Sequence, residues 1–344
     1  MLTATLLITS TSLSGSPHCA AAADNRKLEQ LQSKKKNGSD STTTAVSGSG
    51  RWRFVVSGDH VCDAVVDDDG VTSFPVYVVV VQSRPGQRGR MQRDAVRATW
   101  GSPLHRRVAE PADTRLAFVL GRDAECDRTG SWCAEALRRE SRLYADLVVG
   151  DFADAYRRLS VKSLHALAWA RRHCRSARYV VKVDDDVYVR VELLPRVPAL
   201  CADSAPGPAV IVGSLNVNSS VQRRGPWRVT ERQFPAPRFP PYCSGNVYAM
   251  PSSVADRLLA AAETDSATSA PPFPLEDVYV TALLASAVGA RCVNDDAFPR
   301  WDVGPSRANV ERLRTGGLLA VHNVHYTQMY DVMRQLNDDH DDRR

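Results

Sequence analysis

Apolar residues recur along residues 75–215 in blocks that predict alternating strands and helices. "PVYVVVVQS" (75–83) is a continuous apolar, β-branched run, which is typical of a strand covered on both faces. Helices are predicted at 91–100 and 154–174. The remaining predicted strands are 114–121, 145–151, 178–183 and 209–215. This order favours an α/β fold with a mostly parallel central sheet flanked by helices.

The regular pattern ends after residue 215. Residues 223–246 are rich in proline and aromatic residues, which predicts a long irregular excursion. Two amphipathic helices are predicted after it, near 252–263 and 276–288.

The two ends of the chain differ in composition from its middle. Residues 20–50 are polar and rich in Ser, Thr and Gly, which predicts a disordered stem. The short apolar run Leu2–Ile8 lacks a basic flank and is far shorter than the ~20 residues that span a bilayer. Residues 1–50 therefore hold either a weak signal or the remnant of a membrane anchor, and we favour the remnant. We expect one folded domain at 51–335 and an acidic tail at 336–344.

Three adjacent aspartates interrupt a strand pattern in "YVVKVDDDVYV" (179–189). An aspartate-rich surface turn is the simpler interpretation, but "VYV" resumes strand character at once and aspartate is a poor strand residue. Ligands of open α/β sheets bind beyond the carboxyl ends of strands, where Asp184, Asp185 and Asp186 lie. Adjacent carboxylates repel one another unless a cation neutralises them. Their hard oxygen atoms favour Mn²⁺ or Mg²⁺ over zinc.

The absence of several ligand-binding motifs from the sequence limits which class of ligand the aspartates could serve. There is no Gly-x-x-x-x-Gly-Lys-Ser/Thr loop and no Gly-x-Gly-x-x-Gly turn after the first strand, which argues against P-loop and Rossmann dinucleotide binding. A net charge of +5 from 44 basic and 39 acidic residues is too balanced to indicate a nucleic-acid partner. A sugar nucleotide remains the natural candidate, because its diphosphate leaving group needs charge neutralisation.

Cysteines and glycosylation sequons indicate an oxidising compartment. Eight widely spaced cysteines without a Cys-x-x-Cys pair fit disulfides rather than zinc, although their connectivity cannot be read from the sequence. Sequons occur at Asn37 and Asn218, and each is a weak signal alone.

Six motifs in order give the chain a resemblance to a known family. They are "RDAVRATWG" (93–101), "DFADAYRRLSVKSLHALAW" (151–169), "KVDDDVYV" (182–189), "FPPYCSGNVYAMPSS" (239–253), "LEDVYVTALL" (275–284) and "VHNVHYTQM" (321–329). From Cys62 to about residue 335 the chain resembles the Golgi β-1,3-glycosyltransferases of family 31, the galactosyl- and N-acetylglucosaminyltransferase group with the GT-A fold. The folded domain would then be the catalytic domain.

The resemblance implies a metal and donor site around the aspartates. Asp186 would be the direct metal ligand and His322 would complete the metal site. Asp184 would bind the ribose or sugar of the donor, and Asp185 would support the pair. His325 is a weaker alternative to His322, and a lone histidine is more often structural.

The same resemblance implies that Arg93, Arg97 and Lys162 line the nucleotide pocket. Ordinary charge on a helix surface is the alternative for these three residues.

On the acceptor side, the resemblance makes Asp277 the catalytic base and gives Glu276 the role of orienting it or binding acceptor. Two acids at a helix start are otherwise ordinary partners of the helix dipole. Tyr242, Gly245 and Trp227 would lie on this side, with Tyr242 and Trp227 as candidates for stacking on sugar. We expect the other aromatic residues near the motifs, Trp100, Tyr156 and Trp169, to serve in packing, and packing is also the more common role for a residue such as Trp227.

Four departures from the family pattern concern helix surfaces or the acceptor side. They are Arg158 and Ser160 in the second motif, Val247 beside Asn246, and Thr281. They put the acceptor in doubt more than the metal and base positions.

The implied activity is inverting, Mn²⁺-dependent transfer of galactose from UDP-galactose to the 3-hydroxyl of an acceptor glycan on a glycoprotein or glycolipid. UDP-N-acetylglucosamine is the alternative donor. A non-catalytic glycan-binding relative and a calcium-binding α/β module are further alternatives. The implied setting is the Golgi lumen, with a type II membrane anchor that is missing or degraded here, or else a secreted or soluble lumenal form.

Overall fold

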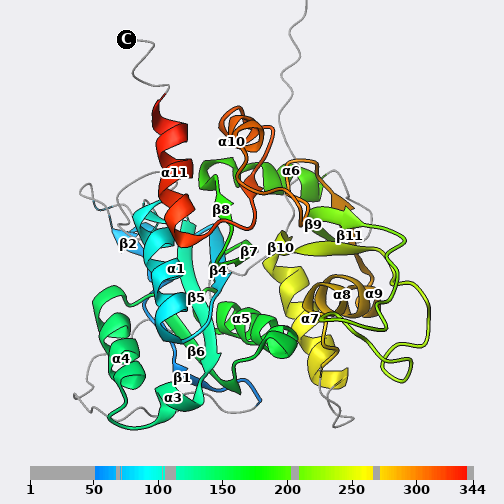
Figure 1. Ribbon diagram of the computed structural model, residues 1–344, viewed down its shortest axis with the longest axis horizontal. Helices are drawn as coiled ribbons and strands as arrows, with labels where there is room; N and C mark the ends of the chain where they lie inside the picture. The colour runs from blue at the N-terminus through cyan, green and yellow to red at the C-terminus, as the bar shows by residue number, and fades with distance from the viewer. Residues whose placement is uncertain are drawn as a thin grey trace, which may run out of the picture. The chain divides into compact units, whose positions relative to one another are not determined.

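The computed structural model describes residues 51–338 with internal gaps (Figure 1). The gaps are residues 67–69, 71, 103, 105–113, 203–208 and 266–271. The predicted stem and anchor remnant, Asn37, and most of the predicted tail lie outside the described residues. Among the described residues, no helix has the length and apolar character needed to cross a membrane.

An eight-stranded sheet forms the centre of the fold, with the order β1-β6-β5-β4-β7-β10-β9-β11. Its strands are β1 (Phe54–Val56), β4 (Tyr77–Gln82), β5 (Thr114–Arg122), β6 (Leu147–Ala153), β7 (Tyr179–Asp184), β9 (Ala209–Asn216), β10 (Tyr242–Pro251) and β11 (Ala290–Asn294). Only β1 and β10 run against the other strands of this sheet. The predicted α/β fold with a mostly parallel central sheet is confirmed.

Helices and short ladders surround this sheet. The helices are α1 (Gly86–Ala98), α3 (Ala124–Asp127), α4 (Trp132–Tyr144), η3 (Tyr156–Arg158), α5 (Leu159–His173), η4 (Val191–Leu193), α6 (Arg196–Ala202), α7 (Ser252–Asp265), α8 (Glu276–Val278), α9 (Ala285–Ala287), α10 (Arg307–Arg314) and α11 (Tyr326–Asn337). A π-helical stretch, Tyr279–Leu284, joins α8 to α9. Two small antiparallel ladders pair β2 (Val65–Val66) with β3 (Thr72–Ser73) and β8 (Tyr188–Val189) with β12 (Ala320–Val321).

The valines of β4 explain why this strand lies at the centre. Val79 and Val81 belong to the core that α1 and α11 cover, whereas Val78 and Val80 belong to the core that α5 and α7 cover. Successive side chains of a strand point to opposite faces, so a continuous apolar run requires helices on both sides. The prediction of a doubly covered strand is confirmed.

Several elements were not predicted from the sequence, among them α4, β10 and β11. Helix α4 begins at Ser131, whose side chain accepts a hydrogen bond from the Ala134 amide, and its surface is rich in charged residues. Strand β10 starts at Tyr242, inside the predicted irregular excursion. It was missed because two of its buried positions, Ser244 and Asn246, are polar and interrupt the apolar pattern. Strand β11 is a short edge strand beside β9.

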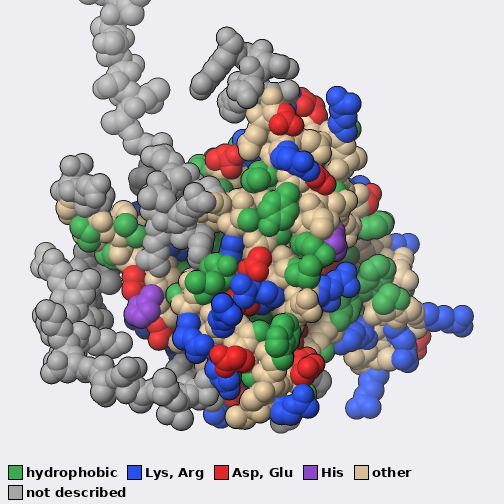
Figure 2. Space-filling view, turned by 60° about the vertical axis from the view of Figure 1, so that its left-hand side comes forward, with side chains coloured by type: hydrophobic (Ala, Val, Ile, Leu, Met, Phe, Trp, Pro, Cys, Tyr) green, Lys and Arg blue, Asp and Glu red, His purple; other side chains and the backbone are tan. Residues whose placement is uncertain are grey.

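Three disulfides link the described part of the chain, which confirms the expectation of disulfides. They are Cys62–Cys174, Cys126–Cys133 and Cys243–Cys292. The first closes a sequence separation of 112 residues and links the segment after β1 to the end of α5. Elsewhere on the surface, acidic and basic side chains are interspersed on the face that Figure 2 shows.

The double variant Cys62→Ser/Cys174→Ser is expected to lower the free energy of unfolding by about 5 kcal/mol, because it frees a long loop in the unfolded chain. Cys126→Ser/Cys133→Ser, which opens a separation of only 7 residues, is the control and should cost about 2 kcal/mol. Urea unfolding monitored by circular dichroism measures both. Equal losses would contradict this explanation.

Candidate active site

The aspartate triplet lies at the carboxyl end of β7, beside the end of β4. Asp184 is the last residue of β7, Asp185 and Asp186 form a turn, and the chain resumes as β8 outside the main sheet. The Val187 amide donates to the Asp184 carbonyl across this turn at 3.2 Å. The composition suggested that the strand continues directly after the triplet, but a turn separates β7 from β8.

Each of the three carboxylates has a partner of its own, although Asp184 and Asp186 lie close enough for their charges to interact. Asp184 accepts from Lys182 Nζ at 2.5 Å, and Asp185 accepts from Ser83 Oγ at 2.7 Å. An Asp186 oxygen lies 3.5 Å from His322 Nε2. Burial raises the pKa of Asp184 to about 6, and the charge of Asp186 adds to this shift against the opposing effect of Lys182.

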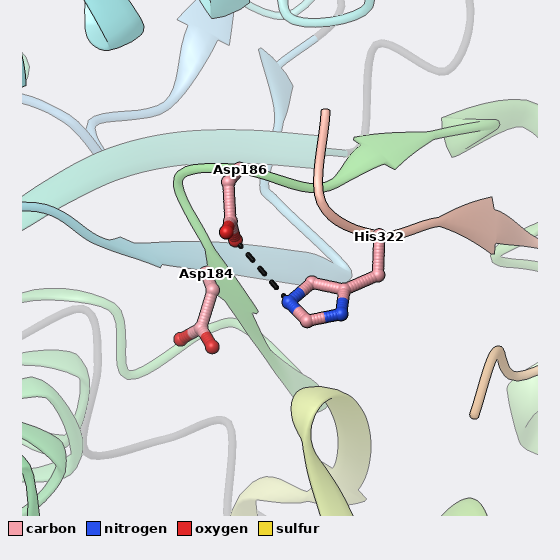
Figure 3. A group of neighbouring side chains, drawn as sticks. All are labelled: Asp184, Asp186 and His322. Carbon is pink, nitrogen blue, oxygen red and sulfur yellow. Dashed lines mark ion pairs between the residues drawn. The ribbon is translucent and has the colours of Figure 1, made fainter. Parts of the chain in front are cut away.

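Asp184, Asp186 and His322 form a group that can hold a metal ion. Ligand atoms of the three residues all lie within 4.8 Å of one another (Figure 3). His322 reaches the group because β12 pairs with β8, with Val321 opposite Tyr188, so the residue after β12 lies near the turn. His325 begins α11 instead and contacts Thr327 Oγ1 at 2.9 Å.

The donor atoms of this group fit a divalent ion. His322 Nδ1 bonds the Trp301 carbonyl at 2.8 Å, so in the neutral imidazole Nε2 is the nitrogen that can bind an ion. Ligands of a six-coordinate ion with bonds of about 2.1 Å lie about 3 Å apart when adjacent, which the 4.8 Å limit allows. Two carboxylates and one imidazole are hard or borderline ligands, so the set fits Mn²⁺ and Mg²⁺.

Lys182 connects the metal group to a second pair of acids, and we did not assign it a role from the sequence. Lys182 and Asp184 lie two apart on β7 and therefore share a face of the sheet. The ammonium group is 3% exposed, donates to the Gly245 carbonyl, and lies 3.7 Å from Glu276 Oε2. Burial lowers its pKa, but Asp184 and Glu276 outweigh this effect, so the pKa of Lys182 is raised and the group stays charged.

Glu276 and Asp277 begin α8 but have different surroundings. Glu276 is buried, and its Oε1 accepts from Ser163 Oγ and from the Tyr248 hydroxyl, each at 2.6 Å. Asp277 is partly exposed, and its carboxylate accepts from the Val278 amide at 2.9 Å. Burial raises the pKa of Asp277 to about 7, and the charge of Glu276 adds to the shift. Glu276 is thus fixed by its partners, whereas Asp277 has free acceptor capacity.

Two of the predicted acceptor-side residues, Gly245 and Tyr242, lie near Asp277. A Cβ on Gly245 would lie 3.2 Å from Asp277 Cβ, so glycine lets β10 approach the acid pair. Tyr242 is close enough for Asp277 to add to the rise in its pKa, which is due first to burial. Trp227 is exposed, and its Nε1 donates to the hydroxyl of Tyr156 at 2.7 Å. We expected Tyr156 to be a packing residue, but it is exposed on the surface.

Arg93 and Arg97 lie inside the protein, behind the site. Their guanidinium groups bind Glu140, and Arg97 also binds Asp146 at 2.7 Å. They are neither ordinary surface charges nor an exposed wall of a nucleotide pocket. Arg93 donates to Ser83 Oγ at 3.1 Å and to the Arg84 carbonyl at 2.7 Å, and Ser83 in turn donates to Asp185.

Lys162 is also buried. Its ammonium group pairs with Asp154 at 2.9 Å and donates to the Ser83 carbonyl. It therefore fixes the backbone at the end of β4, away from solvent. The exposed arginine next to Ser83, Arg84, was not identified from the sequence. Burial raises the pKa of Asp185, and the charge of Arg84 is one of the effects that oppose this rise.

Gln92 joins the two chain segments of the metal group, a role that its position in the sequence does not indicate. Its Nε2 donates to the Asp185 carbonyl at 2.8 Å and to the Val324 carbonyl at 2.9 Å. The Val324 amide also donates to the Asp186 carbonyl at 2.8 Å. The buried amide of Gln92 therefore keeps the aspartate turn and the His322 segment in register.

Comparison with known proteins assigns the chain to a family. The family described as galactosyltransferase matches residues 91–296, more than half of the chain. The chain belongs to the galactosyltransferase family. Membership confirms the resemblance seen in the motifs and identifies the protein as a glycosyltransferase.

The names of individual relatives specify two different transferred sugars, galactose and N-acetylglucosamine. Human beta-1,3-galactosyltransferase 4 is 34% identical over 60% of this chain, and the match spans 59% of that protein. Beta-1,3-galactosyltransferase 5 of Pan paniscus is 27% identical over 82% of this chain and 88% of its own length. Human UDP-GlcNAc:betaGal beta-1,3-N-acetylglucosaminyltransferase 8 is 34% identical over 63% of this chain and 51% of its own length.

The variant Gln92→Met, which keeps the length of the side chain but removes both donors, is expected to weaken Mn²⁺ binding by about tenfold or more, as loss of outer hydrogen bonds at metal sites does. Electron paramagnetic resonance of free Mn²⁺ measures the Kd without turnover. Gln87→Met, an exposed glutamine of the same helix, is the matched control. An unchanged Kd for Gln92→Met would show that this amide does not position the site.

Proposed function

We propose that this glycosyltransferase moves galactose from UDP-galactose to the 3-hydroxyl of an acceptor glycan, with inversion and with Mn²⁺. One observation carries the proposal: Lys182 links Asp184 of the three-residue metal group to Glu276, and the next residue is the partly exposed carboxylate of Asp277. The names of the galactosyltransferase relatives support the choice of sugar and linkage.

On this proposal Asp186 and His322 hold the metal ion, and Asp184 holds the donor near it. When bound, Mn²⁺ or Mg²⁺ neutralises the negative charge of the diphosphate leaving group. Asp185 keeps the turn in place through Ser83. The acceptor enters from the side of Tyr242 and Gly245.

Asp277 performs the proton transfer in this mechanism. The acceptor hydroxyl oxygen attacks the anomeric carbon of the sugar from the face opposite the diphosphate, and its proton passes to an Asp277 oxygen. The bond from the anomeric carbon to the diphosphate oxygen breaks with its electron pair, so the configuration inverts. Glu276, held by Ser163 and Tyr248, orients the start of α8 and raises the basicity of Asp277.

UDP-N-acetylglucosamine is the second candidate donor. The observation in its favour is the N-acetylglucosaminyltransferase relative, which is as identical to this chain as the human galactosyltransferase relative. The residues that hold a diphosphate and a base would serve both sugars.

We further propose that the protein acts in the Golgi lumen, anchored to the membrane. The disulfides and the exposed sequon residue Asn218 support an oxidising, glycosylating compartment.

A donor screen tests the function. UDP-galactose, UDP-N-acetylglucosamine and UDP-N-acetylgalactosamine are incubated with the purified chain and Mn²⁺, and released UDP is measured. UDP-galactose should be hydrolysed fastest. Preference for UDP-N-acetylglucosamine would establish the second donor instead. Absence of Mn²⁺-dependent UDP binding would contradict both donors and favour a glycan-binding or calcium-binding protein.

Asp277→Asn should lower kcat by about 100- to 10,000-fold while Mn²⁺-dependent UDP binding stays at the wild-type level.

In the wild type, a carboxyl with a pKa of about 7 is mostly protonated at lower pH and cannot accept a proton. Transfer should therefore fall about tenfold per pH unit below about pH 7. A flat profile from pH 5 to 8, or undiminished transfer by the variant, would rule out Asp277 as the base.

A further inference from the structure

Two large aromatic side chains are exposed and bonded to each other on the surface. Trp227 is 53% exposed and Tyr156 is 59% exposed, and the indole Nε1 donates to the tyrosine hydroxyl at 2.7 Å. The hydrogen bond occupies the polar edge of each ring and leaves ring surface in water. Exposed apolar surface of this kind marks binding sites more often than scattered single residues do.

The loop that carries Trp227 is held firmly on both sides of the indole. Arg157, next to Tyr156, donates to the Pro226 carbonyl at 3.1 Å and to the Arg228 carbonyl at 2.6 Å. Val229 is fully buried in a small core with Val278. An aromatic side chain fixed in this way loses little conformational entropy when it binds a ligand.

The position of the pair follows from the topology of the sheet. Tyr156 follows β6, and Trp227 lies in the connection from β9 to β10. β6 and β9 run in the same direction as β7, so both segments leave the sheet at the edge where Asp184 lies. In the strand order β6 and β9 stand on opposite sides of β7. The contact therefore joins the two flanks of the site along its rim.

The pair lies toward the acceptor side of this rim. The small core beneath the loop contains Val278, the residue after Asp277, and Tyr242 packs against it. Ser219, in the same connection, hydrogen bonds to Tyr242. A glycan whose reacting hydroxyl meets Asp277 would extend toward this loop.

We propose that the Tyr156–Trp227 pair is a carbohydrate subsite, which takes a sugar residue of the acceptor glycan beyond the residue that is glycosylated. The proposal rests on the proposed function. Pyranose rings have a face of C–H groups that packs on an aromatic ring, while their hydroxyls keep contact with water at the rim. Tyrosine and tryptophan suit such a site because each has an apolar body and a polar edge.

The test compares acceptors of two lengths with Trp227→Ala. Methyl glycosides are the probes, because a benzyl aglycone would itself stack on the rings. Whichever methyl monosaccharide the wild type accepts is compared with a methyl trisaccharide that ends in the same sugar. Trp227→Ala should raise the KM of the trisaccharide by about 3- to 10-fold, as loss of one aromatic contact does. The KM of the monosaccharide and of the sugar nucleotide, and kcat, should not change.

Two further variants separate binding from folding. Trp227→Phe should restore most of the trisaccharide affinity, since it keeps an aromatic face. Trp132→Ala removes an indole that is 66% exposed on α4 and should leave both acceptors unaffected. Equal rises in KM for both acceptors would mean that the loop is only structural, and no change for either would show that the pair binds no sugar.

Saturation-transfer NMR with the same trisaccharide tests the subsite independently of turnover. Saturation of the sugar protons remote from the reacting end should be strong in the wild type and lost in Trp227→Ala. If the donor screen fails but this signal is present, the proposed function is wrong and the subsite stands. If turnover occurs but the signal is absent from the wild type, the subsite is wrong.

Discussion

The buried ammonium group of Lys182 fixes the relative positions of the acids in this site. It donates to Asp184 on its own strand and to the Gly245 carbonyl on β10. It also lies near Glu276 at the start of α8. Loss of one partner from such a buried pair costs about 3–5 kcal/mol, because a charge is left without compensation. The donor-side and acceptor-side carboxylates therefore form one electrostatic unit rather than two separate sites.

The topology of the sheet supplies the other parts of this unit. Parallel strands β4 and β7 end side by side, which brings Ser83 to Asp185. The antiparallel strand β10 brings Gly245 against the acid pair, where a side chain would be crowded. The short ladder of β8 and β12 returns the chain to the aspartate turn, so His322 joins residues that are more than 130 positions earlier.

Sequence reasoning succeeded where a local pattern had a single physical cause. The apolar run of β4 indicated a doubly covered strand, and the adjacent aspartates at the end of β7 indicated a site that can hold a metal ion. It failed where the cause was a distant partner. Arg93 and Arg97 have the spacing of surface residues, and only Glu140 and Asp146, some 40 to 50 positions later, explain their burial. Lys182, Gln92 and Tyr156 belong to the site or its rim through contacts that no local pattern encodes.

The most direct test is the manganese anomalous difference map of crystals grown with Mn²⁺ and UDP. We predict one strong peak about 2–2.5 Å from an Asp186 oxygen and from His322 Nε2, with the Asp277 carboxylate outside the coordination sphere. A peak that His322 does not contact, or one that Asp277 ligates, would contradict the assignment of metal ligands and base.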